Sequence, residues 1–471
     1  MTIMQQSRLT PAGLMVGRTR FDASHRRGVR EHRFCSGRLD VRKWGKSRAA
    51  GGSAETMPRE WDGSSQGEFA MKLTGAFAAS FLTLCWAAAS HAETIKVGVV
   101  LPYSGPNSDL GNQVDKAFDL YVKLHAKDLG DNKIELVKRD EGPASGANAR
   151  TVVTELITND KVKLIAGVVF SPSAIAAAPL ATQTKTPMLI ANAGTAWVTT
   201  LSPYIVRFSF SMWDPAYPMG TYAATKMGCK TAATGFTDYP PGQDSTLAFK
   251  TAFEKAGGKI IDEVRFGPPG PVPDFTPFFQ RVKDEHPDCF YVFVPSGSHA
   301  GGVMKAYGDI GMRQAGVRLI GPMDLIPDYQ FAHMSDAAIG LIVTSSYSDD
   351  LDTPGNQEFV KAWHEAYGPD SYPDFMSAAG MDTMAGVFHV INTLHGDLDD
   401  GARVVETLKG WKHEGYRGEI QIDPETRDVI QPERVEEVIK KSDGKLGVKI
   451  LETYPQVKDE CKVLKVGRCG S

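Results

Sequence analysis

The sequence predicts an α/β protein with two lobes, each built on a mainly parallel sheet that is covered by helices on both faces. From residue 93 onward, strand-like apolar runs alternate with helical segments, which is the pattern of a parallel sheet with crossover helices. The alternation breaks at "SFSMWDPAYP" (209–218) and then restarts. A chain of this length usually divides its core between domains, so we expect two lobes of similar build.

The first series is justified by apolar runs of strand length and by helical periodicity. "IKVGVVLP" (95–102) is a continuous apolar run, and in the next segment Val114, Ala117, Phe118 and Tyr121 fall on one helical face. We expect strands at 95–102, 133–140, 162–169 and 187–192, and helices at 111–130, 148–160 and 171–185.

The second series repeats this arrangement after the break. We expect strands at 230–236, 259–266, 289–294 and 317–321, with helices at 244–258, 276–286 and 301–311 between them. Three further helical segments follow at 356–368, 375–394 and 402–411.

Residues 71–92, "MKLTGAFAASFLTLCWAAASHA", have the three parts of a secretory signal peptide. Lys72 is positive, Ala76–Ala89 is apolar, and small residues at Ser90 and Ala92 suit cleavage after Ala92. The apolar part is shorter than the roughly 20 residues of a membrane-spanning helix. We therefore expect export to the periplasm.

Residues 1–70 differ in kind from the rest of the chain. Basic residues outnumber acidic ones there, and no sustained apolar periodicity is present. We expect this segment to be disordered. Its acidic residues argue against a transit peptide, and we interpret Met71 as the natural start of the protein.

The exported part is acidic and contains an even number of cysteines. Asp and Glu outnumber Lys and Arg, 56 to 52, in the whole chain, which argues against nucleic acid or an anionic membrane as a partner. Disulfides are common in exported proteins. Cys461 and Cys469 bracket a short tail loop, and Cys229 and Cys289 each precede a strand-like run. We expect both pairs to form disulfides, with four free thiols as the alternative.

Candidate site residues follow the expected strands, because ligands of open α/β sheets bind outside the carboxyl ends of the strands. Ser171 and Ser173 open a helix, and we expect Ser173 to be its N-cap. Such a helix start suits a carboxylate, although a plain N-cap serine is the alternative interpretation. The candidates in the first half are Tyr103, Ser104, Leu110, Phe170, Ser171, Ser173, Ala193, Gly194 and Thr195.

The second half offers Tyr239, Ser296, Met323 and Asp324 at equivalent places, each of which also fits a turn. No dinucleotide or P-loop glycine motif is present. His299 lies next to Ser298, but no G-x-S-x-G elbow supports a hydrolase. We expect no enzyme activity, no cofactor and no metal.

In the order and spacing of several segments, the chain resembles the branched-chain amino-acid type of periplasmic solute-binding protein, which serves ABC importers. The segments are "IKVGVVLPYSGPNSDLGNQV", "GVVFSPSAIAAAPLA", "TPMLIANAGT", "DFTPFFQRVKDEHPD" and "AIGLIVTSSY". The resemblance implies a monomer with two Rossmann-like lobes, joined by three crossing strands, that close on a ligand. It implies lobe 1 at 93–212 and 345–428, lobe 2 at 213–344 and 429–471, and an ABC permease as partner.

The resemblance also implies roles for individual residues. Ser171, Ala193 and Thr195 match positions that hold the ligand carboxylate, and Tyr239 matches a tyrosine of lobe 2. Met323 stands where amino-acid binders carry a glutamate for the ammonium group, with Asp324 next to it. A buried ammonium without its partner costs several kcal/mol.

We therefore favour a carboxylate with an aromatic or apolar body, which other members of the family capture. The aromatic residues Trp197, Phe210 and Trp213 follow the same strands. A branched-chain amino acid or an amide is the alternative ligand, and a ligand sensor for a membrane receptor is the alternative function.

Overall fold

The computed structural model describes residues 94–334 and 336–470. By their contacts, all described residues belong to one unit of the chain. The predictions for residues 1–70, for the signal peptide and for its cleavage site lie outside the described residues. Within the described ranges, no helix is long and apolar enough to cross a lipid bilayer.

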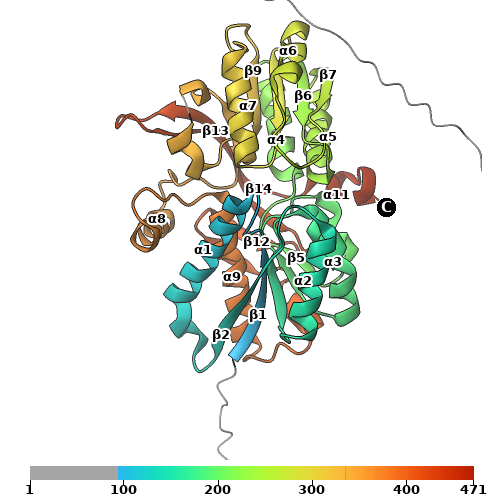
Figure 1. Ribbon diagram of the computed structural model, residues 1–471, viewed down its shortest axis with the longest axis vertical. Helices are drawn as coiled ribbons and strands as arrows, with labels where there is room; N and C mark the ends of the chain where they lie inside the picture. The colour runs from blue at the N-terminus through green and yellow to red at the C-terminus, as the bar shows by residue number, and fades with distance from the viewer. Residues whose placement is uncertain (1–93, 335, 471) are drawn as a thin grey trace, which may run out of the picture. The chain divides into compact units, whose positions relative to one another are not determined.

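A parallel sheet of five strands, counted over the described residues, forms the centre of lobe 1 (Figure 1). Its order is β2-β1-β3-β4-β5, and the inner strands are buried because helices cover both faces. The strands are β1 (Thr94–Leu101), β2 (Lys133–Asp140), β3 (Leu164–Gly167), β4 (Met188–Ile190) and β5 (Ile205–Arg207). The helices are α1 (Ser108–His125), α2 (Gly146–Thr158), α3 (Ser171–Thr184), α8 (Pro354–Tyr367), α9 (Phe375–Thr393) and α10 (Gly401–Leu408).

Lobe 2 is built on a second sheet, whose parallel part has the order β7-β6-β8-β9-β10. This order matches that of lobe 1, so the two α/β series expected from the sequence form sheets of the same topology. The strands are β6 (Thr231–Phe236), β7 (Lys259–Arg265), β8 (Cys289–Phe293), β9 (Arg318–Pro322) and β10 (Ile342–Ser345). The helices are α4 (Trp213–Thr225), α5 (Pro240–Lys255), α6 (Thr276–Glu285) and α7 (Ser298–Asp309).

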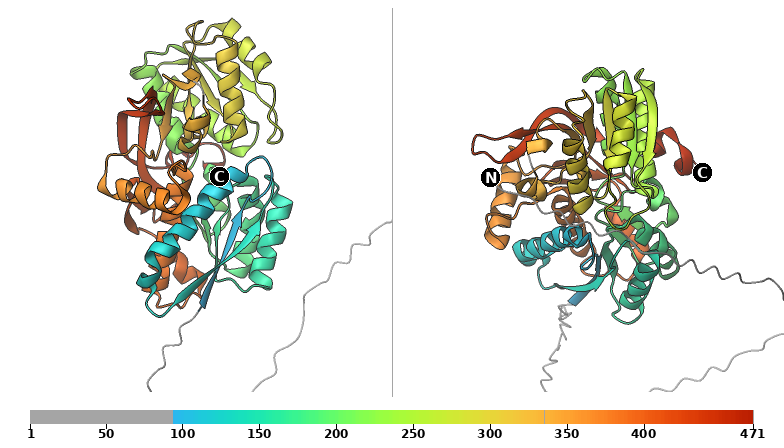
Figure 2. Two further views of the ribbon diagram at one scale, coloured as in Figure 1. Left: turned by 60° about the vertical axis from the view of Figure 1, so that its left-hand side comes forward. Right: turned by 45° about the horizontal axis from the view of Figure 1, so that its top comes forward.

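Antiparallel strands extend the second sheet, a feature that the sequence did not lead us to expect. β13 pairs with β10, β14 pairs with β13, and β12 and β11 continue from the start of β13. Figure 2 shows β13 and β14 in red, beside the green and yellow elements of lobe 2. Their bounds are β11 (Lys412–Gly415), β12 (Gly418–Ile422), β13 (Val429–Lys440) and β14 (Leu446–Val457), and the short helix α11 (Glu460–Leu464) follows.

The chain passes between the lobes at three places in its described part. These are the segments between β5 and α4, between β10 and α8, and between β12 and β13. As a result, α8 and α9 return to lobe 1, where α9 packs against α1 (Figure 1). The largest apolar cluster is centred on lobe 1 but also includes Phe236, Phe293 and Met323 of lobe 2. Apolar packing therefore continues from one lobe into the other.

Two further expectations from the sequence concern local structure. Cys229 is paired with Cys289 and Cys461 with Cys469, at Cα–Cα distances of 6.1 Å and 5.8 Å, within the usual range for disulfides. The expectation that Ser173 caps α3 is wrong. The helix begins at Ser171 with Phe170 at the N-cap, because Pro172 is well suited to the first turn.

Candidate ligand-binding site

Segments that follow the parallel strands of both lobes meet at one small cavity. The segments after β1, β3, β4 and β5 line it from lobe 1, and those after β6, β8 and β9 line it from lobe 2. This is where α/β sheets build their ligand sites. The lining consists of Leu110, Val169, Phe170, Ser171, Asn192, Gly194, Phe210, Met212, Tyr239, Pro241, Phe293, Pro295, Ser296 and Asp324.

The first turn of α3 presents Ser171 to this cavity. The side chain of the N-cap residue, Phe170, makes no capping hydrogen bond, and backbone N–H groups give this end of a helix a partial positive charge. The Ser171 Oγ accepts a hydrogen bond of 3.1 Å from the Thr195 N–H, and a hydroxyl group also has one proton to donate. The turn is therefore suited to an anionic group.

Glu141 lies directly behind the same turn. It is fully buried, its Oε1 accepts a hydrogen bond of 3.1 Å from the Val169 N–H, and the Ser173 side chain lies beside it. Burial raises the pKa of Glu141 to about 8. At neutral pH the carboxyl group is therefore mostly protonated, so it supports the turn without placing a full negative charge behind the positive end of the helix.

The loop after β4 forms the adjacent wall of the cavity. The Asn192 side chain donates a 3.0 Å hydrogen bond to the Val169 carbonyl, which joins this loop to the one after β3. A Cβ atom at Gly194 would lie 3.0 Å from Met212 Sδ and 3.2 Å from the Phe210 ring. Glycine at this position therefore allows the two apolar side chains to approach the loop.

Arg207 holds this loop from outside the cavity. The buried guanidinium donates hydrogen bonds to the carbonyl oxygens of Ala193, at 3.2 Å, and Thr195, at 2.7 Å. It also lies 2.6 Å from the Asp428 carboxylate and 3.5 Å from that of Asp459. These carboxylates compensate the charge of Arg207, whose role here is to fix the loop.

Lobe 2 contributes an aromatic wall. The rings of Tyr239 and Phe293 are stacked with centroids 6.0 Å apart. Burial, and to a smaller extent the nearby Asp324, raise the pKa of Tyr239 above its ordinary value. The phenol therefore keeps its proton and is able to donate a hydrogen bond into the site.

Asp324 and Ser296 form the polar part of the lobe 2 wall. Asp324 is 6% exposed and Ser296 is fully buried. The Ser296 Oγ lies 3.4 Å from Asp324 Oδ1, whereas Asp324 Oδ2 has no hydrogen-bond partner among the described residues. Burial raises the pKa of Asp324 to about 7. A buried carboxyl group with an unsatisfied oxygen beside a cavity is a candidate for ligand contact.

The cavity has a volume of about 20 Å³, close to the space that one water molecule requires. Two hydrogen bonds join the lobes near it. The Asn107 side chain donates to the Ser296 carbonyl at 3.4 Å, and the Ala196 N–H donates to Asp244 at 2.9 Å. An organic ligand therefore requires the lobes to separate, or the lining side chains to withdraw, before it enters.

The structure brings part of the predicted residue set to the cavity and leaves the rest outside its lining. The lining includes Leu110, Phe170, Ser171, Gly194, Tyr239, Ser296 and Asp324. The predicted residues outside it are Tyr103, Ser104, Ser173, Ala193, Thr195 and Met323.

The residues outside the lining have other contacts. The Tyr103 hydroxyl donates a 2.7 Å hydrogen bond to Asp115, and Ser104 is exposed. Ala193 and Thr195 lie behind Gly194 with their carbonyl groups on Arg207. Met323 is 2% exposed and belongs to the apolar core. Direct contact between any of these residues and a ligand stays a prediction.

Sequence reasoning missed several lining residues, and it also missed Glu141 and Arg207, the two buried residues that support the loops. Phe293 is the last residue of β8, and Glu141 directly follows β2, so the rule of strand ends pointed to both. Met212 lies in the segment that we interpreted only as a break between the lobes. The missed lining residues are Val169, Asn192, Met212, Pro241, Phe293 and Pro295, and Phe210 was noted only for its aromatic ring.

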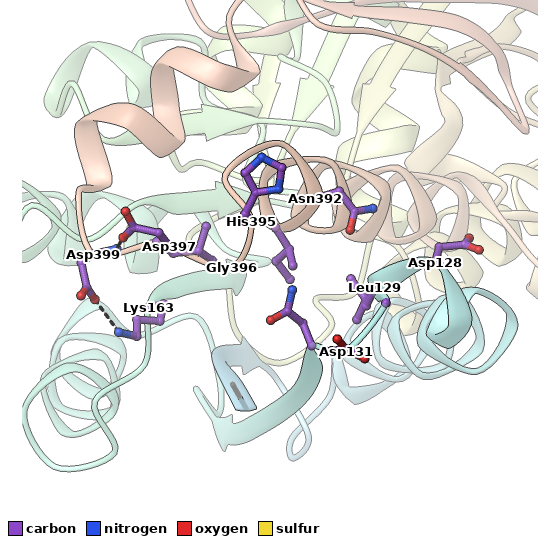
Figure 3. A pocket seen from close by; sticks show the side chains of 13 residues that line it. Asp128, Leu129, Asp131, Lys163, Asn392, His395, Gly396, Asp397 and Asp399 are labelled. Atoms are coloured by element: carbon purple, nitrogen blue, oxygen red, sulfur yellow. Dashed lines mark hydrogen bonds and ion pairs between the residues drawn. The ribbon is translucent and has the colours of Figure 1, made fainter. Parts of the chain in front are cut away.

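A second, larger pocket of about 670 Å³ lies at the opposite, amino-terminal edge of the lobe 1 sheet (Figure 3). Two of its acidic side chains are paired with neighbouring cations: Asp399 with Lys163, and Asp397 with Arg403 at 3.1 Å. Over the described residues, no group of histidine, cysteine or acidic side chains is arranged to hold a metal ion. We therefore place the candidate site at the interlobe cavity.

Comparison with known proteins supports this description of the fold. The periplasmic binding protein family matches residues 94–445. The Leu/Ile/Val-binding protein homolog 6 of Brucella abortus (strain 2308) is 35% identical over 373 residues, which cover 79% of this chain and 95% of the relative.

Two solved structures of ABC transporter solute binding proteins are also similar, each with a TM-score of 0.75 over 78% of this chain. One, from Rhodopseudomonas palustris BisB5 in complex with 3,4-dihydroxybenzoic acid, is 40% identical with 99% of its chain covered. The other, from Rhodopseudomonas palustris HaA2 in complex with p-hydroxybenzoic acid, is 35% identical with 98% covered.

Two lobes of matching topology with a cavity at their facing strand ends define a binding protein of the type I periplasmic fold. The chain belongs to the periplasmic binding protein family. The family and these structures are solute-binding proteins of transport systems, which implies an extracytoplasmic location.

Proposed function

We propose that this protein captures a small carboxylate with an aromatic or apolar body in the interlobe cavity and delivers it to the permease of an ABC importer. We further propose that it acts as a monomer, carries out no chemistry on its ligand, and reaches the periplasm through a signal peptide cleaved after Ala92. The similar solute-binding proteins that were solved with hydroxylated benzoic acids support this choice of ligand.

The observation that carries the proposal is the division of the cavity lining into an anion-binding end and an apolar body. The first turn of α3 offers the Ser171 hydroxyl and the partial positive charge of a helix N-terminus, which suit a carboxylate although the described lining contains no lysine or arginine. Phe170, Phe210 and Phe293 contribute apolar surface to the same cavity. A ring inserted between them gains the free energy of apolar burial, about 25 cal/mol per Å².

Capture follows from contacts with both lobes. A ligand that touches Ser171 in lobe 1 and Tyr239 in lobe 2 binds more tightly when the lobes are together, so it shifts the protein toward that state. The permease then recognises the surface that both lobes form when they are together. In this mechanism the protein supplies selection and transfer, and the ligand leaves unchanged.

A branched-chain amino acid or an amide is the second candidate, because Asp324 lines the cavity. Its carboxylate is able to pair with an ammonium group, although burial of the charged form is costly unless it is paired. This candidate therefore depends on Asp324 becoming ionised when the ligand binds.

Thermal-shift screening of protein stripped of ligand by unfolding and refolding tests the proposal. The panel contains benzoate, hydroxybenzoates, leucine, valine, aliphatic diacids and amides. A ligand at 100 times its Kd adds about 2.7 kcal/mol to the free energy of unfolding. We expect shifts with aromatic acids. Shifts with leucine or valine alone would establish the amino-acid candidate, and a panel without any shift from a carboxylate would contradict the proposal.

A further inference from the structure

Asp324 is the acidic residue of the cavity lining, and its surroundings provide no compensating charge. The described lining contains no lysine or arginine. Oδ1 is paired only with Ser296, and Oδ2 has no partner among the described residues. An unsatisfied buried acceptor costs about 1–3 kcal/mol. A donor supplied by the ligand would remove this cost.

From this geometry we infer that the ligand carries a hydroxyl group on its ring as well as a carboxylate, and that Asp324 selects it by accepting a hydrogen bond from that hydroxyl. The inference rests on the proposed function and narrows its ligand class to hydroxylated aromatic monocarboxylates.

The arrangement of the two lobes supports this assignment. The anion-binding turn of α3 belongs to lobe 1, whereas Asp324 follows β9 in lobe 2. The aromatic side chains of Phe210 and Phe293 also come from different lobes. A ring held between them therefore presents one polar substituent to each lobe, the carboxylate to Ser171 and the hydroxyl to Asp324.

A neutral donor fits Asp324 better than a cation does. Burial holds the pKa of Asp324 near 7, so both protonation states are populated around neutral pH. Each state has an oxygen that accepts a hydrogen bond from a phenol, and Ser296 already holds the other oxygen in place. An ammonium group is compensated only by the ionised form.

Titration calorimetry with benzoate, 3-hydroxybenzoate and 4-hydroxybenzoate tests the inference on the wild-type protein and on Asp324→Leu. The wild type is expected to bind at least one hydroxybenzoate about 10- to 100-fold more tightly than benzoate. This is the gain in affinity that a hydrogen bond to a charged or buried acid typically provides. In Asp324→Leu this ratio is expected to fall toward one. Asp324→Asn keeps the shape of the side chain and is expected to show a smaller ratio than the wild type, so the test survives if the leucine variant fails to fold.

Asp309→Asn is the matched control, because Asp309 is exposed on α7 and pairs with Lys305. It is expected to retain the wild-type ratio. Equal affinities for benzoate and both hydroxybenzoates in the wild type would overturn the inference while leaving the proposed function intact. A ratio of hydroxybenzoate to benzoate affinity that stays unchanged in both Asp324 variants would have the same consequence. Failure of every aromatic acid to bind, together with leucine binding that is lost in Asp324→Asn, would overturn both.

Discussion

Glu141 and Asp324 are buried carboxyl groups on opposite sides of the cavity, and they have different surroundings. Glu141 accepts a hydrogen bond from the Val169 backbone and stays behind the wall, whereas Asp324 reaches the lining with one oxygen unpaired. The first is suited to holding a loop and the second to touching a ligand. Burial raises the pKa of both groups.

Glu141→Gln is expected to change how stability depends on pH. A carboxyl group whose pKa is raised in the folded protein, here to about 8 by burial, contributes stability that is fully present below its unfolded pKa and is lost as pH rises through the folded pKa. The wild type should therefore lose up to about 4 kcal/mol relative to the glutamine variant between pH 4.5 and pH 8. Denaturant unfolding of both proteins over this range measures the difference.

Glu135→Gln serves as the control for this experiment, since Glu135 is an exposed residue of the preceding strand β2. It should follow the wild type at every pH. A constant difference between the wild type and Glu141→Gln from pH 4.5 to pH 8 would contradict the account of Glu141.

At the scale of single residues, the sequence indicated the position of the candidate site at the strand ends. It was less informative about which side chains line the cavity. Met323 and Asp324 follow the same strand end, and the resemblance drew attention to Met323. The chain enters a short 3-10 helix at Met323–Leu325, which buries the methionine in the core and leaves the aspartate in the cavity lining. Neither periodicity nor composition distinguishes two neighbours at a turn of this kind.

At the scale of elements, the loop after β4 and helix α5 form a direct link between the lobes. The Ala196 N–H of this loop donates a 2.9 Å hydrogen bond to Asp244 on α5. Arg207 fixes the same loop from within lobe 1. The link therefore joins the loop after β4 to lobe 2 and exists only while the two elements are close together.

Asp244→Ala is expected to weaken ligand binding. Loss of a hydrogen bond to a charged group costs about 1.5–3 kcal/mol, and here the cost falls on the state in which the lobes are together. We expect Kd for the aromatic acid to rise about tenfold or more, as measured by titration calorimetry.

Thr251→Ala on the same helix is the control, because the exposed Thr251 hydroxyl bonds only within α5. If both variants bind the ligand with the wild-type affinity, the Asp244 link does not contribute to capture.

The parallel strands could be predicted because they are apolar runs between clear helical segments. The antiparallel strand β13 could not. Its buried residues include Glu433, Arg434 and Glu436, and charges of this kind normally indicate a solvated surface. Arg434 is accommodated because it donates hydrogen bonds to the carbonyls of Ser346, at 2.7 Å, and Arg417, at 2.8 Å. These partners are distant in sequence, so no local pattern reveals them.

At the scale of the whole molecule, two sheets of the same strand order face one cavity. The restart of the α/β alternation after residue 218 was sufficient to predict two lobes. The three passages of the chain between the lobes were expected only from the resemblance to a family. They depend on contacts between distant segments, which no local pattern of the sequence reveals. The fold positions the ends of seven parallel strands around the candidate site.

A crystal structure of the protein with bound 4-hydroxybenzoate tests the central claim most directly. The account predicts the ligand between the lobes, with its carboxylate at Ser171 and the first turn of α3 and its hydroxyl at Asp324. A carboxylate bound to lobe 2, or a ligand bound at the pocket around Asp399, would contradict it.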